Sequence, residues 1–506
     1  MRSLRKIFGS RMLLLALAIL AQIIVLILIV GYSAKYSELV YDILRLASII
    51  LVISVINEHN NPRFLITWVA IIGIFPLIGP VAYLLLANRK VSKDLSGATF
   101  KTMNDHDNLL KRINDVNYNL NTNYKNQFNF VENTTSYVYN NNTSGHYYPC
   151  GDDFFIDFFK DLKAAEHFIF LEFFIVSDGE IWNKTKKILI EKAQSGLKVV
   201  LNCDDFGSST LMTKNLVKEL EENNISVALF NKLRPRILVT MNNRNHRKLI
   251  VVDNKVAYTG GCNLADEYAN KIERFGHWRD SMLRIEGRAV WNITVMFLQI
   301  YNAINNQEYL EYEDYHLTYD KIENSSLYLP FSDSPNDNEN VGRNVHLNMI
   351  NSASKYLYIS TPYLVLDYSL ETALINARKK GVDVRILTPH IPDKFYVFAL
   401  TRKGYKVLLD NGIKIYEYEP GFNHAKDILC DDEIGLVGTV NTDYRSYFMH
   451  FEDGVLFNDP KVIKEMKKSF NDGFSKSIEI DVAYLEKANI FVKIFRSLMV
   501  LLAPLM

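Results

Sequence analysis

The amino-acid sequence predicts an α/β protein of two duplicated lobes, each a mixed β-sheet flanked by helices, preceded by an N-terminal transmembrane helical region. Three observations lead to this prediction: long apolar runs near the N-terminus, alternating strand-like and helix-like patterns further on, and an internal repeat. A chain of 506 residues is also too long for one ordinary domain. We therefore expect a membrane region at 1–90, a linker at 91–142, a first lobe at 143–320, a second lobe at 321–485 and an apolar, membrane-associating C-terminal segment at 486–506.

Two apolar stretches in the first 90 residues are long enough to span a bilayer, at about 12–32 and 64–87. A helix of about 20 residues crosses the ~30 Å hydrocarbon core. The first stretch exceeds the apolar core of a normal signal peptide and no small-x-small cleavage site follows it, which favours a retained anchor. In the second, Pro76 predicts a kink.

The stretch 39–56 leaves two or three spans open. It is apolar, but Asp42 and Arg45 would each cost about 2.5–3.5 kcal/mol at the membrane centre. With two spans, the basic residues before and after the membrane region both lie on the cytoplasmic side, as the positive-inside rule asks. We therefore expect a multi-pass protein of the cell membrane with a cytoplasmic catalytic region.

At the other end, the apolar segment 489–506 carries Lys493 and Arg496. It fits a helix at the membrane interface or a terminal helix docked on a lobe, and both interpretations stay open.

An internal repeat predicts the two lobes. Three strand and helix units recur in the same order: 167–179 matches 355–367, 191–202 matches 376–389, and 216–230 matches 406–418. Gly196 and Gly381 stand at matching positions where a helix C-cap would pass into a buried strand. Such agreement indicates duplication.

Each repeat ends in the same polar signature. The first copy consists of His246, Lys248, Asp253, Gly260 and Asn263, and the second of His424, Lys426, Asp431, Gly438 and Asn441. The intervals agree at every step: two, five, seven and three positions. A single His-x-Lys would usually be a surface or core pair, whereas two copies at matched intervals indicate a site.

These residue types suit chemistry at phosphorus. In an extended segment the side chains at i and i+2 share a face, so each His would lie beside its Lys. A neutral imidazole can act as a nucleophile or a proton shuttle, and an ammonium stabilises negative charge on a phosphoryl group. Asn263 and Asn441 would donate hydrogen bonds to the same oxygens. Two lysines supply the charge that a metal pair would otherwise bring, so we expect no metal and no cofactor.

Composition excludes other classes. The 57 basic and 57 acidic residues balance, and no long basic stripe stands out, which argues against a nucleic-acid partner. The four cysteines show neither disulfide-framework nor zinc-site spacing, which predicts separate, mostly buried thiols at Cys150, Cys203, Cys262 and Cys430.

The duplicated signature resembles that of the phospholipase D superfamily, His-x-Lys-x₄-Asp followed by Gly-x-x-Asn, over roughly residues 140–485. The resemblance implies that one histidine forms a phosphohistidine while the other protonates the leaving group and then deprotonates the acceptor. It implies a structural role for the motif acids Asp253 and Asp431. It also implies that an acid about thirty positions beyond each histidine orients the imidazoles, here Asp280 and Glu452.

Flanking segments such as 244–268, 275–287 and 438–452 resemble bacterial cardiolipin synthases, and so does the element formed by Asn441, Asp443, Arg445 and Ser446. His450 departs from that family, which more often has Asn there, and its effect is left open. The resemblance implies that two phosphatidylglycerol molecules react to give cardiolipin and glycerol, with membrane lipid as the partner.

Several alternatives stay open. A hydrolytic phospholipase D or another phosphatidyltransferase would share the same phosphohistidine, and a nuclease or a non-catalytic membrane scaffold fits less well. The two signatures are alike, so the nucleophile is undecided, although we favour His246. The acceptor lipid, the acyl preference and the oligomeric state are not predicted.

Overall fold

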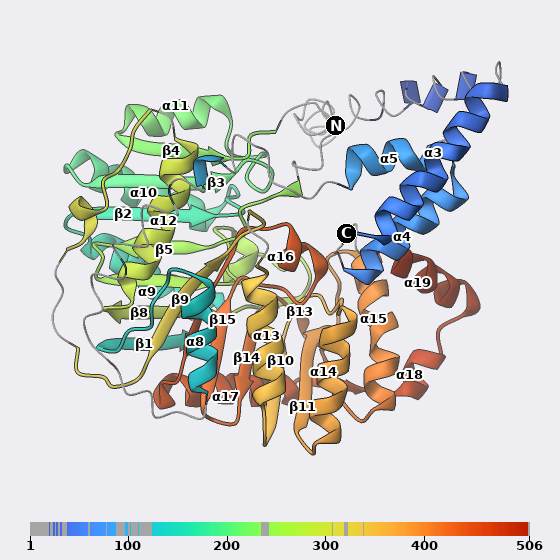
Figure 1. Cartoon of the computed structure of the whole chain (residues 1–506). Helices are drawn as coiled ribbons and strands as arrows, with labels where there is room; N and C mark the ends of the chain where they lie inside the picture. Colours follow the sequence, from blue (N-terminus) through green and yellow to red (C-terminus); the bar gives the residue numbers. More distant parts are fainter. Residues whose placement is uncertain are drawn as a thin grey trace.

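The computed structural model describes residues 20, 24–25, 27–28, 31–32, 38–58, 61–76, 78–87, 97–99, 102, 110, 124–233, 242–305, 307–317, 322–336 and 339–503. Two sheet-containing lobes lie side by side, and a group of helices from the N-terminal region stands against the second lobe (Figure 1).

The first lobe is a seven-stranded mixed sheet of order β1-β8-β6-β5-β2-β3-β4. Strands β2, β3 and β4 run parallel, and the others join antiparallel. Its strands are β1 Thr143–Tyr148, β2 Phe168–Phe173, β3 Lys198–Asp204, β4 Ile225–Phe230, β5 Leu249–Val252, β6 Val256–Gly260 and β8 Met282–Gly287. Its helices are α9 Gly151–Ala164, α10 Glu180–Gln194, α11 Lys214–Glu222 and α12 Val290–Ile304, with short 3-10 turns at Asp266–Ala269 and Glu313–Tyr315.

The second lobe is an eight-stranded mixed sheet of order β17-β12-β11-β10-β14-β15-β16-β9. Its strands are β9 Tyr328–Asp333, β10 Tyr356–Ser360, β11 Asp383–Pro389, β12 Lys414–Tyr418, β14 Asp427–Cys430, β15 Ile434–Gly438, β16 Glu452–Phe457 and β17 Ser477–Ile480. Its helices are α13 Val341–Ser352, α14 Tyr368–Lys379, α15 Phe395–Asp410, α16 Tyr444–Phe448 and α17 Pro460–Ser475.

The predicted duplication and the mixed sheets are confirmed. Strands β2, β3, β4, β5, β6, β8 and β1 have the same neighbours as β10, β11, β12, β14, β15, β16 and β9, and within these two described sheets only β17 has no counterpart. Gly196 and Gly381 both have left-handed backbone, with φ of 97° and 100°, at the turn that joins helix to strand. That conformation favours glycine, as the predicted C-caps require.

The lobes share one core and touch through short strands. A single cluster of buried apolar side chains contains residues of both sheets, such as Phe170 and Val200 from the first and Leu357 and Ile386 from the second. Strand β7 (His277–Arg279) of the first lobe pairs in parallel with β13 (Gly421–Asn423) of the second. An isolated parallel bridge joins Asn245 to Phe451. The two lobes therefore form one packed unit rather than two separately folded domains.

The N-terminal helices form a packed group. They are α3 Glu38–Ile56, α4 Pro62–Ile74 and α5 Gly79–Leu86, and Val55, Phe64, Trp68, Ile72 and Tyr83 form their buried cluster. The prediction of one kinked helix over 64–87 is wrong, because the chain leaves the helix at Phe75, before Pro76, and a new helix begins at Gly79.

None of the helices that the structure describes combines the length and apolar character needed to cross a bilayer. The predicted span 12–32 lies largely outside the described residues.

The segments before and after the two lobes pack against them. Helix α8 (Lys125–Thr134) falls within the predicted linker but packs on α13, so the end of that linker is packed against the second lobe. Helices α18 (Val482–Glu486) and α19 (Ile490–Leu502) follow the last strand, and α19 lies along α15 (Figure 1). Phe491 and Leu498 of α19 remain exposed, so this helix both docks on a lobe and presents an apolar face.

Candidate active site

The two predicted signatures meet at one cavity of about 500 Å³ between the lobes. His246 lies just before β5 and His424 just after β13, and both imidazoles line this cavity together with Asn263 and Asn441. Because the cavity is shared, one phosphorus-containing group can face both histidines.

Contacts between the lobes fix the backbone of each histidine. The His246 amide donates to the carbonyl of Phe451 (2.9 Å), and the His424 amide donates to that of Arg279 (2.7 Å). The acid of the opposite lobe follows directly in sequence after each accepting residue, as Glu452 and Asp280.

The histidine–acid pairs therefore cross between the lobes. His246 Nδ1 lies 2.9 Å from Glu452 Oε2, and His424 Nδ1 lies 2.6 Å from Asp280 Oδ2. Both acids expected from the sequence are at the site, but the spacing implied Asp280 for His246 and Glu452 for His424, and that pairing is wrong. Neither histidine has its carboxylate partner unless both lobes are present.

Charge within each pair settles the tautomer. Burial raises the pKa of Asp280, but the neighbouring His424 and Lys426 more than offset it, so this pKa is lowered overall. Burial also raises the pKa of Glu452, but the contact with His246 outweighs burial, so the pKa of Glu452 is lowered overall. An ionised carboxylate only accepts hydrogen bonds, so each Nδ1 carries the proton and donates it.

The same burial keeps the imidazoles neutral. It lowers the pKa of His246 to about 3 and that of His424 to about 4, against the attraction of their carboxylates. A neutral imidazole protonated at Nδ1 has its lone pair on Nε2. Each histidine is thus in the form that can attack phosphorus or accept a proton.

Lys248 and Lys426 lie buried beside the histidines, and each Nζ donates to the backbone carbonyl of the histidine two positions before it. Burial lowers the pKa of Lys248 to about 7 and also lowers that of Lys426. Neither lysine lines the cavity itself, but an anion bound beside the histidines would favour the charged form of both.

The two asparagines differ in how they are held. Asn263 donates from Nδ2 to the Tyr268 hydroxyl (2.7 Å) and accepts the Ile175 amide (2.9 Å). Asn441 Oδ1 is buried without a hydrogen-bond partner among the described residues. Both side chains line the cavity, where their role toward phosphate stays a prediction.

The motif acids Asp253 and Asp431 do not line the cavity and instead hold backbone. Asp253 accepts the amides of Glu166, His167 and Phe168, ahead of β2, at 2.7–2.8 Å. Asp431 accepts the amides of Ser354, Lys355 and Tyr356, ahead of β10, at 2.8 Å. These contacts anchor β2 and β10, each of which pairs with the strand that follows a signature histidine, as expected of structural acids.

The comparisons with known proteins agree with this geometry. The family model described as "Cardiolipin synthase, PLD-like domain" matches residues 158–288 and 346–473, one match in each lobe. The chain belongs to the cardiolipin synthase family. A second model, described as "Phospholipase D-nuclease N-terminal", matches residues 46–88.

Similar relatives extend over most of the chain. A cardiolipin synthase of Staphylococcus aureus is 30% identical over 498 residues, covering 94% of this chain and 99% of its own. Cardiolipin synthase 2 of Bacillus anthracis is 32% identical over 455 residues, covering 89% and 88%. A phosphatidylserine synthase structure from Haemophilus influenzae has a TM-score of 0.56 at 14% identity, covering 71% of this chain and 93% of that one, which indicates a shared fold.

Aromatic side chains that the sequence did not single out surround the histidines. Phe174 meets the His246 ring edge-on, with centroids 5.3 Å apart. Tyr268, Trp278 and Phe422 surround His424 at 5.4–5.7 Å. In the sequence, only the position of Trp278, two residues before Asp280, indicated that one of these aromatic side chains would lie at the site. Apolar rings at these positions lower the local dielectric constant and so strengthen the charge interactions beside them.

His450 makes the two lobes unequal. Its Nδ1 lies 3.3 Å from Glu452 Oε1, and its ring centroid lies 5.3 Å from that of His246. Glu452 therefore accepts from two imidazoles, whereas Asp280 serves one.

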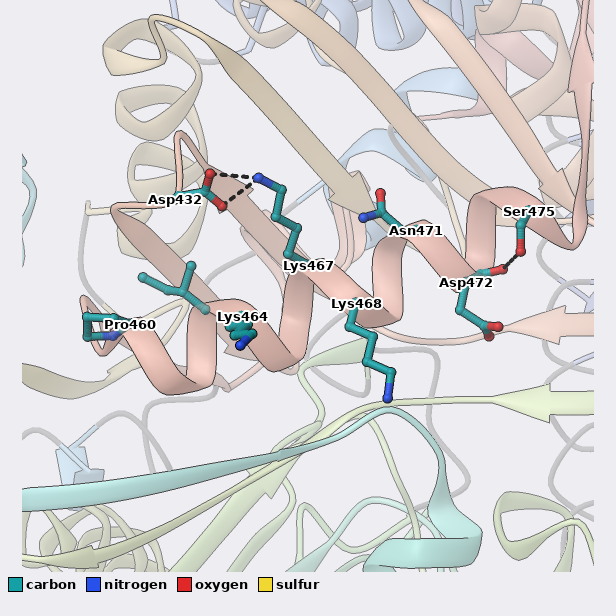
Figure 2. Close-up of a pocket in the computed structure, with 9 residues that line it drawn as sticks. Asp432, Pro460, Lys464, Lys467, Lys468, Asn471, Asp472 and Ser475 are labelled. Carbon is teal, nitrogen blue, oxygen red and sulfur yellow. Dashed lines mark hydrogen bonds and ion pairs between the residues drawn. The ribbon is translucent and has the colours of Figure 1, made fainter.

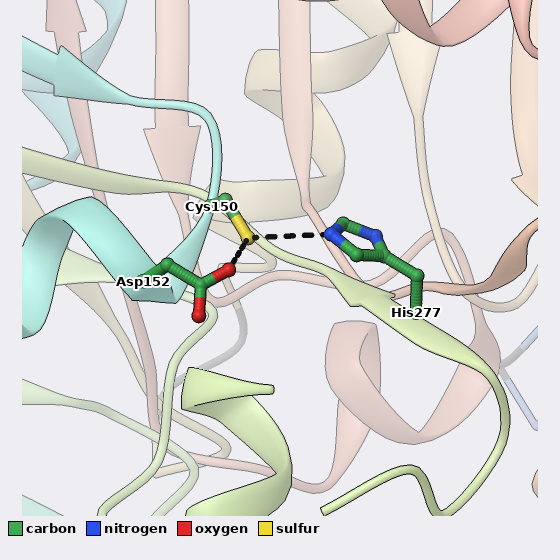
Figure 3. Close-up of side chains that lie close together, drawn as sticks. All are labelled: Cys150, Asp152 and His277. Carbon is green, nitrogen blue, oxygen red and sulfur yellow. Dashed lines mark hydrogen bonds between the residues drawn. The ribbon is translucent and has the colours of Figure 1, made fainter. Parts of the chain in front are cut away.

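Among the described residues, two groups have the ligand types for a metal ion. One is His246, His450 and Glu452, at the cavity wall, and the other joins Cys150 and Asp152, at the start of α9, to His277 of β7 (Figure 3). In the second group the Asn270 amide donates to Cys150 Sγ (3.3 Å) and Asp152 Oδ2 (2.9 Å), which accounts for their closeness. All four cysteines are free, and three are buried, as predicted.

A larger hollow of about 750 Å³ lies elsewhere, along α17 (Figure 2). Its walls carry Lys464, Lys467 and Lys468, and Lys467 is paired with Asp432 at 2.6 Å. Neither signature histidine lines this hollow.

Proposed function

We propose that the chain transfers the phosphatidyl group of one phosphatidylglycerol to the glycerol headgroup of another, forming cardiolipin and releasing glycerol. Membership of the cardiolipin synthase family makes it an enzyme of phosphatidyl transfer. One observation carries the proposal: two neutral imidazoles, each held by a carboxylate of the opposite lobe, share a single cavity.

The chemistry divides into two displacements at phosphorus. In the first, Nε2 of one histidine forms a P–N bond as the P–O bond to glycerol breaks, and the other imidazolium gives its proton to the departing oxygen. In the second, that imidazole takes the proton of the acceptor hydroxyl, whose oxygen forms a P–O bond as the P–N bond breaks. Lys248 and Lys426 stabilise the charge on the phosphoryl oxygens in both steps. Asn263 and Asn441 would donate to the same oxygens.

The histidine that acts as an acid must first take up a proton. The bound phosphodiester supplies negative charge that favours the imidazolium, offsetting burial. We assign His246 as the nucleophile and His424 as the acid and base, and a trapped phosphopeptide identifies the residue directly.

We also place the protein in the cell membrane as a multi-pass protein with its catalytic lobes on the cytoplasmic side. The apolar segments of the first 90 residues and their flanking basic residues support this placement. Exposed apolar side chains on α3 and α19, including Ile50, Ile53, Phe491 and Ile494, support contact with lipid.

Product analysis tests the function. Purified protein in detergent micelles should convert phosphatidylglycerol to cardiolipin plus an equal amount of glycerol, with EDTA present and no nucleotide added. Formation of phosphatidic acid alone would contradict transfer and establish a hydrolytic phospholipase D instead.

Substitutions test the site. His246→Ala and His424→Ala should each abolish cardiolipin formation, because each removes one of the two imidazoles that the displacements require. The control is His167→Ala, an exposed histidine whose side chain is outside the cavity. Full turnover by both cavity variants would exclude the assignment.

A further inference from the structure

The cavity with the two histidines continues into a smaller hollow of about 180 Å³. The two hollows share five lining residues, Tyr363, Lys394, Tyr396, Asp443 and Arg445. The far wall of the smaller one is apolar and includes Val365, Leu400 and Ala503. Ala503 follows α19, the helix that lies along α15 with an exposed apolar face (Figure 1).

Arg445 stands where the hollows join. It belongs to α16 and is half-buried, and its carbonyl accepts the amides of Met449 (3.0 Å) and His450 (3.1 Å). Across the described chain, no hydrogen bond or ion pair occupies its guanidinium. Asp443 is nearby but caps α16, accepting the Ser446 amide at 2.8 Å.

The other cations of the cavity wall already have partners. Arg244 lies 3.6 Å from Asp204 and donates to the Asn231 carbonyl. Arg274 pairs with Glu267 at 3.0 Å, and Lys394 pairs with Asp393 at 3.0 Å. Arg445 is attracted by the nearby Asp443, but among the described residues no side chain accepts a hydrogen bond from its guanidinium.

Arg244 and Arg445 also lie close enough to repel each other. Burial lowers the pKa of Arg244, and Arg445 adds to that effect. Two guanidinium groups in a partly buried space favour an anion between or beside them. A phosphate matches the planar fork of an arginine and can accept two hydrogen bonds from it.

We propose that Arg445 binds the phosphate of the acceptor lipid, with the smaller hollow holding the part of that lipid next to the phosphate. This subsite rests on the proposed function, since the reaction needs two phospholipids and the His-Lys pairs hold only one phosphorus. The apolar wall of Val365, Leu400 and Ala503 leads toward α19 and suits the glycerol backbone and the first acyl carbons.

The subsite predicts a preference for lipid over small acceptors. An acceptor whose phosphate is held by Arg445 presents its primary hydroxyl at the phosphohistidine with little remaining freedom, which raises its rate of attack. Glycerol and water have no phosphate and gain nothing from this contact. Arg445 is accordingly a specificity residue for the second displacement.

Two reactions of one enzyme test this directly. Cardiolipin formation needs a phosphate-bearing acceptor, whereas exchange of labelled glycerol into phosphatidylglycerol needs only the donor site. In Arg445→Gln, the ratio of cardiolipin formation to glycerol exchange should fall at least ten-fold, and Arg445→Lys should restore part of it. Arg274→Gln, which removes a cavity arginine already paired with Glu267, should change the ratio less than two-fold.

The outcomes separate the two proposals. If wild-type protein catalyses neither reaction, the proposed function fails. If Arg445→Gln lowers both reactions in proportion, or if Arg274→Gln changes the ratio as much, the acceptor subsite is excluded. A second measurement uses glycerol 3-phosphate as a soluble acceptor: wild type should prefer it to glycerol, and Arg445→Gln should lose that preference. An equal preference in both proteins would also exclude the subsite.

Discussion

At the scale of single residues, the main feature is the exchange of carboxylates between the lobes. Glu452 of the second lobe holds His246 of the first, and Asp280 of the first holds His424 of the second. An uncharged amide in place of either acid would no longer favour the Nδ1-protonated tautomer or stabilise the imidazolium.

The crossed contacts between histidines and acids predict which variants are impaired in the same reaction step. Asp280→Asn should lower turnover on the order of 10²-fold and change the same step as His424→Ala, because Asp280 acts through that imidazole. Glu452→Gln should instead change the same step as His246→Ala. Rapid-quench measurement of phosphoenzyme formation and breakdown distinguishes the steps. Matching phenotypes within each lobe, Asp280→Asn with His246→Ala, would contradict the crossed arrangement.

The sequence identified the histidines and the acids of the site, but it did not show which acid contacts which histidine. The matched intervals predicted His246, Lys248, His424 and Lys426 as neighbours of one phosphate. Both histidines line one cavity, and each lysine contacts the carbonyl of its histidine without lining the cavity. The crossing depends on β7 pairing with β13 and on the bridge from Asn245 to Phe451, which are tertiary contacts with no local signal.

At the scale of elements, the signature glycines allow neighbouring strands to approach. A Cβ on Gly438, at the end of β15, would lie 2.4 Å from the Asp453 carbonyl oxygen and 2.7 Å from Gly454 Cα. A Cβ on Gly260, at the end of β6, would lie 2.3 Å from the Ser281 carbonyl oxygen. β16 begins with Glu452, and β8 begins two positions after Asp280, so each of these strands starts at or near an acid that holds a histidine.

Gly438→Ala should therefore damage both stability and activity. Relieving the overlap must move β16, and Glu452 with it, at a cost of about 1–3 kcal/mol in the free energy of unfolding. Urea unfolding and cardiolipin assays on the same preparation measure the two effects. The control is Gly404→Ala within α15, whose Cβ would be 3.9 Å from its nearest neighbour. It should stabilise the protein by about 0.5–1 kcal/mol, since alanine favours a helix over glycine. Normal activity and stability in Gly438→Ala would exclude this role.

The elements also show where the sequence was insufficient. Period and repeat predicted three strand and helix units in each lobe, because a buried strand or an amphipathic helix follows from the local order of apolar residues. Composition alone suggested one span over 64–87 and a plain linker up to 142. Pro76 ends α4, and α8 packs on α13 through contacts distant in sequence, including Gln127 to Ser352 at 2.9 Å.

At the scale of the whole molecule, buried acids join the two lobes. Asp427 of β14 accepts from Tyr147 (2.8 Å) and Ser281 (2.7 Å) of the first lobe. Asp453 of β16 accepts from Thr259 of β6 through Oδ2, while its Oδ1 is buried with no hydrogen-bond partner in the described parts of the chain. Burial raises the pKa of Asp427 to about 6 and that of Asp453 to about 7.

These raised values make the joint between the lobes sensitive to pH. An aspartate in the unfolded chain has a pKa of about 3.9, so between about pH 4 and 7 the folded protein binds the Asp453 proton more tightly than the unfolded chain. The contribution of Asp453 to the free energy of unfolding therefore decreases as pH rises through this window. In Asp453→Asn, the amide that replaces the carboxyl group cannot ionise but can still accept from Thr259. Relative to wild type, this variant should gain stability with rising pH, by up to about 1.4 kcal/mol per pH unit.

Urea unfolding at pH values from 4 to 8 measures this difference. Asp472→Asn, at an exposed carboxylate of α17, provides the matched control and should show no comparable rise. Because both lobes share one apolar cluster, the gain should appear equally in hydrogen exchange of β2–β4 and of β10–β12. A gain confined to the second lobe would mean that the lobes unfold separately, and a flat difference across the pH range would mean that Asp453 remains charged in the folded protein.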